Sequence, residues 1–196
     1  ILAADVAGYS RLMGDDERAT IDAINRCRAV FREHIEANGG RVVDMAGDSV
    51  LAIFDTAIGA FTTAMAAQEG LASLNADIPD DRRMAWRIGV NLGDIHEQDD
   101  GTVYGDGVNV AARLEALSEP GGICLSDKVH TEVRGKIDRA FADLGEHDVK
   151  NIAEPVRAYR VLAEGEVAPA RPKRTLPLVL AGAAVVAIVV AFLWPG

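Results

Sequence analysis

The order of strand and helix signals is the feature that most constrains what this chain can fold into. Two short apolar runs, at 41–46 and 49–54, are separated by Gly47-Asp48 and predict a β-hairpin. Before the hairpin, apolar residues recur at three- and four-residue steps and predict an amphipathic helix over 16–38. Hairpins and helices mixed in this way predict an α+β domain.

The rest of the pattern refines this prediction. The further elements we expect are strands at 1–6, 86–97 and 123–126, an Ala-rich helix at 56–75, and a helix from Asp106 or Gly107 to Leu117. The resulting order, β-α-β-β-α-β, predicts a ferredoxin-like sandwich with additions at its C-terminal end.

The charge distribution argues against nucleic-acid binding. The 196 residues include 20 Lys and Arg and 30 Asp and Glu, for a formal net charge of −10. Residues 1–166 hold 17 of these bases and all 30 acids, a net charge of −13. Non-specific nucleic-acid binding depends on clustered bases that neutralise phosphates. We therefore expect a phosphate ligand to be held by metal ions and a few placed cations.

A 19-residue run without a charge, from Leu176 to Trp194, predicts a transmembrane helix. At 1.5 Å per residue it spans about 28 Å, close to the thickness of a bilayer core. The preceding linker, at 164–175, is Pro-rich and carries three bases. Because positive charges stay on the cytoplasmic side, we expect a single-pass membrane anchor with residues 1–163 in the cytoplasm. The first residue is Ile1, so we expect the chain to be a piece of a longer protein.

Two aspartates are candidate metal ligands. Asp5 ends the first predicted strand and precedes a Gly-containing turn, and Asp48 lies in the hairpin turn. Carboxylates at the strand ends of one sheet, next to backbone amides, could hold Mg²⁺ ions that bridge a polyphosphate. The alternative is that Asp48 only forms the turn.

The segment YGDGVNVAARLEAL, at 104–117, is the other candidate functional element. Asn109 and Arg113 stand four residues apart and therefore share one face of the predicted helix. The alternative is a solvated face on which Arg113 and Glu115 are surface charges. Lys150, a base in an acidic stretch, would on its own be a surface lysine.

Five segments, taken together and in this order, resemble the catalytic domain of class III nucleotide cyclases over residues 1–163. These segments are AADVAGYS, AGDSVLAIF, IGVNLGDI, YGDGVNVAARLEAL and GEHDVKNIAEPVRAYRV. The arrangement with a downstream apolar helix is similar to bacterial members tethered to the inner membrane. The resemblance implies a phosphorus–oxygen lyase that makes 3′,5′-cyclic AMP and pyrophosphate from ATP.

The resemblance assigns roles to individual residues. Asp5, Val6 and Asp48 would hold two metal ions, Mg²⁺ or Mn²⁺, and the backbone of Ala7, Gly8 and Tyr9 would contact the phosphates. Asn109 would position the ribose and Arg113 would stabilise charge on the α-phosphate. Lys150 would bind the terminal phosphates.

The family works as a dimer in which the aspartates of one subunit face the Asn, Arg and Lys of the other. The resemblance therefore implies a homodimer with two composite sites and with a nucleoside triphosphate as its substrate.

The positions that would contact the purine are Asp44 and Thr102. Adenylate cyclases usually carry Lys at the first, where it donates to adenine N1, and guanylate cyclases carry Glu. Thr102 is similar to one bacterial adenylate-cyclase subclass, whereas the carboxylate of Asp44 accepts hydrogen bonds, as guanine recognition requires. ATP is the expected substrate. The alternatives are a guanylate cyclase in which Asp44 recognises guanine, or a degenerate module that only binds nucleotide or dimerises.

Overall fold

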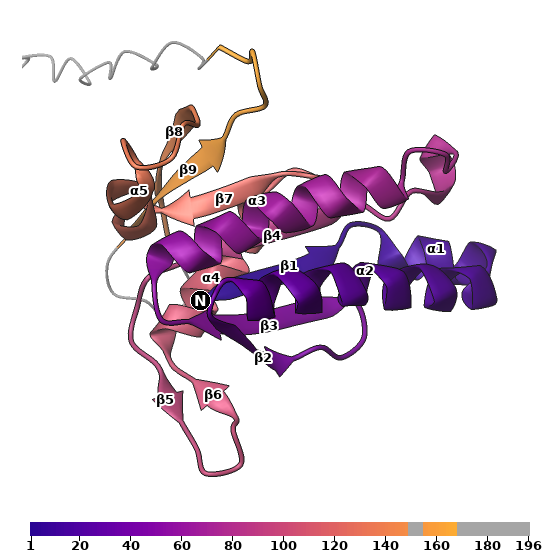
Figure 1. Cartoon of the computed structure of the whole chain (residues 1–196), viewed down its shortest axis with the longest axis horizontal. Coiled ribbons are helices and arrows are strands. Elements are labelled where there is room, and N and C mark those ends of the chain that lie inside the picture. The colour runs from indigo at the N-terminus through magenta and orange to yellow at the C-terminus, as the bar shows by residue number, and fades with distance from the viewer. Residues whose placement is uncertain (149–154, 168–196) are drawn as a thin grey trace, which may run out of the picture.

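A computed structural model of the chain describes residues 1–148 and 155–167 (Figure 1). Its strands are β1 (Leu2–Val6), β2 (Gly40–Asp44), β3 (Ser49–Phe54), β4 (Trp86–Val90), β5 (His96–Glu97), β6 (Val103–Tyr104), β7 (Ile123–Ser126), β8 (Phe141–His147) and β9 (Val156–Val161). Its helices are α1 (Tyr9–Asp15), α2 (Glu17–Ala37), α3 (Ala57–Leu74), α4 (Asp106–Leu117), α5 (Asp127–Val133) and a short 3₁₀ turn, η1 (Asp80–Arg82).

The main sheet confirms the predicted α+β architecture. Its seven strands lie in the order β2-β3-β1-β4-β7-β9-β8, and β4 and β7 are parallel neighbours. The part formed by β1 to β4 with α2 and α3 has the order β2-β3-β1-β4, which is the ferredoxin-like arrangement. The later strands extend this sheet, and β5 and β6 form a separate hairpin that projects from it (Figure 1).

Alternating side chains of β1 divide the sheet into two faces. Leu2, Ala4 and Val6 belong to the main core, where they pack with buried residues of α2 and α3. Ile1 and Ala3 point to the opposite face and pack with Ala111 of α4. Asp5 comes two residues after Ala3 and therefore points to the same face, so its carboxylate lies on the face that α4 covers.

A glycine in β4 lets α4 lie close against that face. A Cβ atom at Gly89 would lie 2.2 Å from the carbonyl oxygen of Ala111 and 2.2 Å from the backbone nitrogen of Glu115. Any larger residue would force the helix away from the sheet.

One predicted strand has the wrong bounds. The strand expected at 86–97 ends at Val90, because Asn91 turns inward and its amide donates to the carbonyl of Gly107 at 3.0 Å. Only His96 and Glu97 are extended again, in β5. The helix expected over 16–38 is confirmed as α2, which begins at Glu17 with Asp16 as its cap and ends at Ala37. The short helix α1, which was not predicted, precedes it.

Across residues 1–148 and 155–167, no helix is both long enough and apolar enough to cross a bilayer. The transmembrane helix predicted at 176–194 lies outside this part of the chain and stays a prediction.

Candidate active site

The end of β1 brings Asp5 beside a basic residue that the sequence analysis did not single out. Asp5 lies opposite Ser49 on β3 and opposite Arg87 on β4. Its Oδ1 atom accepts hydrogen bonds from Nε and Nη2 of Arg87, at 3.1 and 2.6 Å. Residues directly opposite each other in a sheet share a face, so Arg87 also points toward α4.

The turn after β1 is built from Ala7 and Gly8. Gly8 adopts a left-handed conformation with φ of 71°, which favours glycine. The amide of Ala7 donates to the carbonyl of Ala85 at 2.9 Å, and α1 begins at Tyr9. The predicted phosphate-contacting backbone therefore forms a strand-to-helix turn next to Asp5.

Asp48 lies next to this turn. The amide of Val6 donates to the carbonyl of Asp48 at 3.1 Å. On its other side the hairpin turn is held by α2, where the guanidinium of Arg28 donates to the carbonyl of Gly47. The structure thus brings together Asp5, Val6 and Asp48, the three residues predicted to hold metal.

The chemistry of these donors fits Mg²⁺ or Mn²⁺. Carboxylate and carbonyl oxygens are the hard ligands that Mg²⁺ prefers, and Mg²⁺ usually takes only one or two carboxylates plus substrate phosphates. Across residues 1–148 and 155–167, no cluster of three or more His, Cys, Asp or Glu side chains could hold a metal. The two aspartates would therefore hold the cation together with the phosphates of a bound triphosphate, which would supply the remaining oxygen ligands.

Glu115 of α4 completes the surroundings of Asp5. Its Oε1 atom lies 3.2 Å from Nε of Arg87, and the residue is only 9% exposed. Burial, with the negative charge of Asp5, raises the pKa of Glu115 to about 7, although Arg87 opposes this shift. The interpretation of Glu115 as a surface charge is therefore wrong.

Asn109 and Arg113 lie on a different face of α4. Both are exposed, and neither side chain makes a hydrogen bond or ion pair with the rest of the described chain. Successive helical residues are about 100° apart, so Arg113 points roughly 160° away from Glu115. The structure keeps Asn109 and Arg113 together, as predicted, but does not direct them at Asp5 and Asp48 of the same chain.

A bulge in β2 directs Asp44 to the α4 side of the sheet. The register shifts between Val42 and Asp44, so that Asp44 lies opposite Leu51, which packs with Ala111 on that side. Without the extra residue, Asp44 would face the main core side. The carboxylate of Asp44 is exposed.

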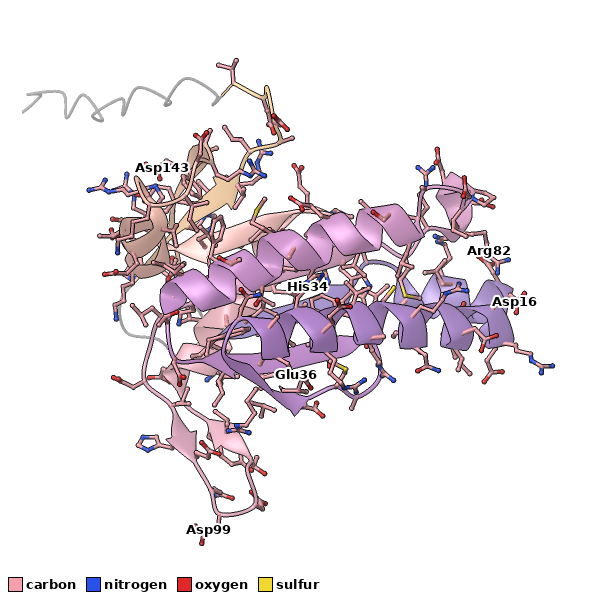
Figure 2. All side chains as sticks on the ribbon, in the orientation of Figure 1. Asp16, His34, Glu36, Arg82, Asp99 and Asp143 are labelled. Carbon is pink, nitrogen blue, oxygen red and sulfur yellow. The ribbon has the colours of Figure 1, made fainter. Side chains whose placement is uncertain are left out.

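Thr102 lies in the β5–β6 hairpin, which has Asp99 at its tip (Figure 2). Its amide donates to Oδ1 of Asp100 at 2.9 Å, and its carbonyl accepts from the amide of Gln98 at 2.9 Å. An ion pair of 2.6 Å between Arg41 and Glu97 joins this hairpin to β2. The two elements that carry the predicted purine contacts are therefore linked.

A cavity of about 600 Å³ opens beside the start of α4. Its wall includes Gly107 and Val110 of α4, Asp127 and Lys128 of α5, and Arg157 of β9. A cavity of this volume lies within the usual range for small-molecule sites. Lys150 lies outside the residues that the structure describes, so its predicted contact with phosphates stays a prediction.

Comparison with known proteins identifies the family of this chain. Residues 1–163 match the family model described as the adenylate and guanylate cyclase catalytic domain. A Rhizobium meliloti (strain 1021) protein named "Putative adenylate cyclase 3" is 47% identical over 160 residues, which are 81% of this chain and 27% of that protein. An adenylate cyclase of Glutamicibacter nicotianae is 34% identical over 129 residues, 64% of this chain and 30% of that protein.

A solved structure extends the comparison to three dimensions. The adenylate/guanylate cyclase/hydrolase from Silicibacter pomeroyi is 44% identical and has a TM-score of 0.73. The match covers 83% of this chain and 95% of that one. This chain spans about a quarter to a third of the length of the two curated relatives. The sequence match, the shared fold and the adjacent aspartates show that the chain belongs to the adenylate and guanylate cyclase catalytic domain family.

Proposed function

We propose that this domain converts a nucleoside triphosphate to a 3′,5′-cyclic nucleotide and pyrophosphate. The observation that carries the proposal is the hydrogen bond from the amide of Val6 to the carbonyl of Asp48, which holds Asp48 beside the end of β1, where Asp5 lies. In the reaction, the ribose 3′-hydroxyl gives its proton to water, and its oxygen bonds to the α-phosphorus. The bond from that phosphorus to pyrophosphate breaks, and pyrophosphate leaves with the bonding electron pair.

In this proposal some residues bind the metal ions and others position the substrate. Two divalent cations, Mg²⁺ or Mn²⁺, held by Asp5, Asp48 and Val6, would lower the pKa of the 3′-hydroxyl and neutralise pyrophosphate. The turn of Ala7, Gly8 and Tyr9 would contact the phosphates through the amides of Gly8 and Tyr9, because the amide of Ala7 already donates to the carbonyl of Ala85. Asn109 orients the ribose, Arg113 stabilises charge at the α-phosphate, and Lys150 binds the terminal phosphates.

The active unit we propose is a homodimer with composite sites. Asn109 and Arg113 are exposed and point away from the aspartates of their own chain. A second copy can place these side chains against the metal-binding half, and its own metal-binding half then receives those of the first. Each of the two sites would thus need both chains.

ATP is the substrate we propose, because the curated relatives are adenylate cyclases by name and Thr102 is present. Asp44 is the feature that favours GTP, since a carboxylate accepts from guanine N1–H but does not donate to adenine N1. If ATP is the substrate, incubation of the protein with Mn²⁺ and equal concentrations of ATP and GTP should yield mainly cyclic AMP. The two cyclic nucleotides are quantified by mass spectrometry. Asp48→Ala supplies the blank.

Each other outcome of this assay has a defined meaning. Cyclic GMP as the main product would contradict the choice of ATP and make Asp44 the guanine contact, in which case Asp44→Lys should lower the cyclic GMP fraction. No product from a confirmed dimer would contradict the enzyme proposal and leave a module that binds nucleotide or dimerises.

We also propose that residues 176–194 anchor the domain in a bacterial inner membrane, with residues 1–163 in the cytoplasm. The support is the uncharged run and the three bases before it. When expressed in bacteria, the full chain should sediment with membranes and resist carbonate extraction, whereas a chain ending at residue 166 should not. A full chain that stays in the soluble fraction would contradict this anchor.

A further inference from the structure

One arginine is shared by two acids at the centre of the site. Arg87 donates through Nε and Nη2 to Oδ1 of Asp5, and the same Nε lies 3.2 Å from Oε1 of Glu115. The Glu115 oxygen is buried and has no hydrogen bond of good geometry to any described residue. Nε therefore lies between two carboxylates and satisfies only one of them.

This arrangement creates a competition at Asp5. A divalent cation that binds Asp5 meets the positive guanidinium of Arg87, which already occupies Oδ1. The cation repels the guanidinium and competes for the same carboxylate, which weakens the pair between Arg87 and Asp5. The Arg87 side chain is only 29% exposed, so water replaces the weakened contact incompletely. Among the described residues, Glu115 is the other acid within ion-pair distance of Arg87.

We propose that Glu115 is a positioning residue that takes Arg87 over from Asp5 when a divalent cation binds. Full pairing with Glu115 compensates Arg87 and satisfies the orphaned Oε1 atom, which lowers the cost of freeing Asp5. Glu115 is well placed for this because α4 lies directly on Gly89, two residues from Arg87 in β4. This inference rests on the metal site of the proposed function.

The test measures Mn²⁺ binding by electron paramagnetic resonance, with Mn²⁺ alone as the probe and the 196-residue chain as the protein. Glu115→Gln should raise the Kd of the Asp5-dependent site about tenfold, the size of one charge-assisted hydrogen bond. Asp5→Ala identifies which ions belong to the site. As the control, Glu69→Gln removes an exposed glutamate that lies 3.6 Å from Arg139, and it should leave the Kd unchanged.

A double-mutant cycle separates positioning from a simple loss of negative charge. With Arg87→Met there is no guanidinium to move, so adding Glu115→Gln should change the Kd less than about twofold. An equal tenfold loss in both backgrounds would overturn the proposal, and so would a wild-type Kd in Glu115→Gln. Mn²⁺ binding that Asp5→Ala does not weaken would overturn it as well.

Two further results keep the interpretation clear. Thermal unfolding should show Glu115→Gln folded, and Glu115→Asp, which keeps the charge, should recover part of the lost affinity. Metal binding does not require turnover. A chain that binds Mn²⁺ as expected but makes no cyclic nucleotide would therefore contradict the cyclase proposal and not this one.

Discussion

Replacing Arg113 with alanine is expected to lower the rate of cyclic nucleotide formation about a thousandfold, with little change in KM. The proposed role explains this split between the two constants. Arg113 stabilises charge that develops on the α-phosphate only as the 3′-oxygen attacks, and such a contact contributes to the transition state more than to substrate binding. The effect should appear in kcat under saturating substrate.

The structural setting of Arg113 makes this variant informative. Its side chain is exposed and forms no hydrogen bond or ion pair within the described chain, so its truncation removes no polar contact there. The thermal midpoint should stay within about 2 °C of wild type, because exposed substitutions of this kind change stability little. A large loss of rate without a loss of stability would thus be a chemical effect.

Two variants control for charge and geometry. Arg18→Ala removes another exposed arginine, on α2, and should leave the rate unchanged. Arg113→Lys keeps the charge but loses the planar fork of the guanidinium, so its rate should fall between those of wild type and Arg113→Ala. A rate within tenfold of wild type for Arg113→Ala would contradict the proposed role.

Local sequence signals predicted much of the fold. The three- and four-residue apolar steps located α2 to within a residue of its observed bounds, and Gly47-Asp48 marked the turn between β2 and β3. These elements form from contacts between residues close in sequence. α1 was missed because seven residues with one buried side chain, Leu12, carry no amphipathic pattern.

The partners of Asp5 could not be predicted because they come from distant parts of the chain. Arg87 follows Asp5 by 82 residues and reaches it only through the β1–β4 register. An available signal was the charge of Arg87 in the otherwise apolar run WRIGV. Glu115 follows the buried Leu114 by one residue, and a residue at that place on a helix can be either buried or solvated. Sequence spacing alone therefore did not identify Glu115.

The orientation of Asp44 was also beyond sequence pattern. Alternation in an unbroken strand would place Val42 and Asp44 on one face, whereas the bulge between them sends Asp44 to the other. Candidate residues on regular elements were thus predictable in type and spacing, but the side of the sheet they occupy depends on such irregularities.

Asp48→Ala is expected to abolish cyclic nucleotide formation, with a loss of at least about a thousandfold. The carboxylate is one of two proposed to bind the cations on which the reaction depends, and alanine offers no oxygen in its place. The carbonyl of residue 48 still accepts from Val6, so the turn should persist and the dimer should form. Gel filtration and cyclic nucleotide quantification measure the two properties together.

Mixing this inactive variant with the inactive Arg113→Ala should restore activity. In a mixed dimer, one site combines the intact aspartates of the Arg113→Ala chain with the intact Arg113 of the Asp48→Ala chain. Random exchange makes half of the dimers mixed, each with one working site of two, so about a quarter of wild-type activity is expected. Recovery requires that each site take residues from both chains.

A matched mixture tests whether this recovery is specific. Asp5→Ala mixed with Asp48→Ala should stay inactive, because both changes fall in the same half of the site and every mixed dimer lacks a complete pair of aspartates. Activity in this mixture, or none in the mixture with Arg113→Ala despite proven subunit exchange, would contradict composite sites. The contrast between the two mixtures depends only on which face of the chain carries each residue, and α4 separates those faces by directing Glu115 to Arg87 while it exposes Arg113.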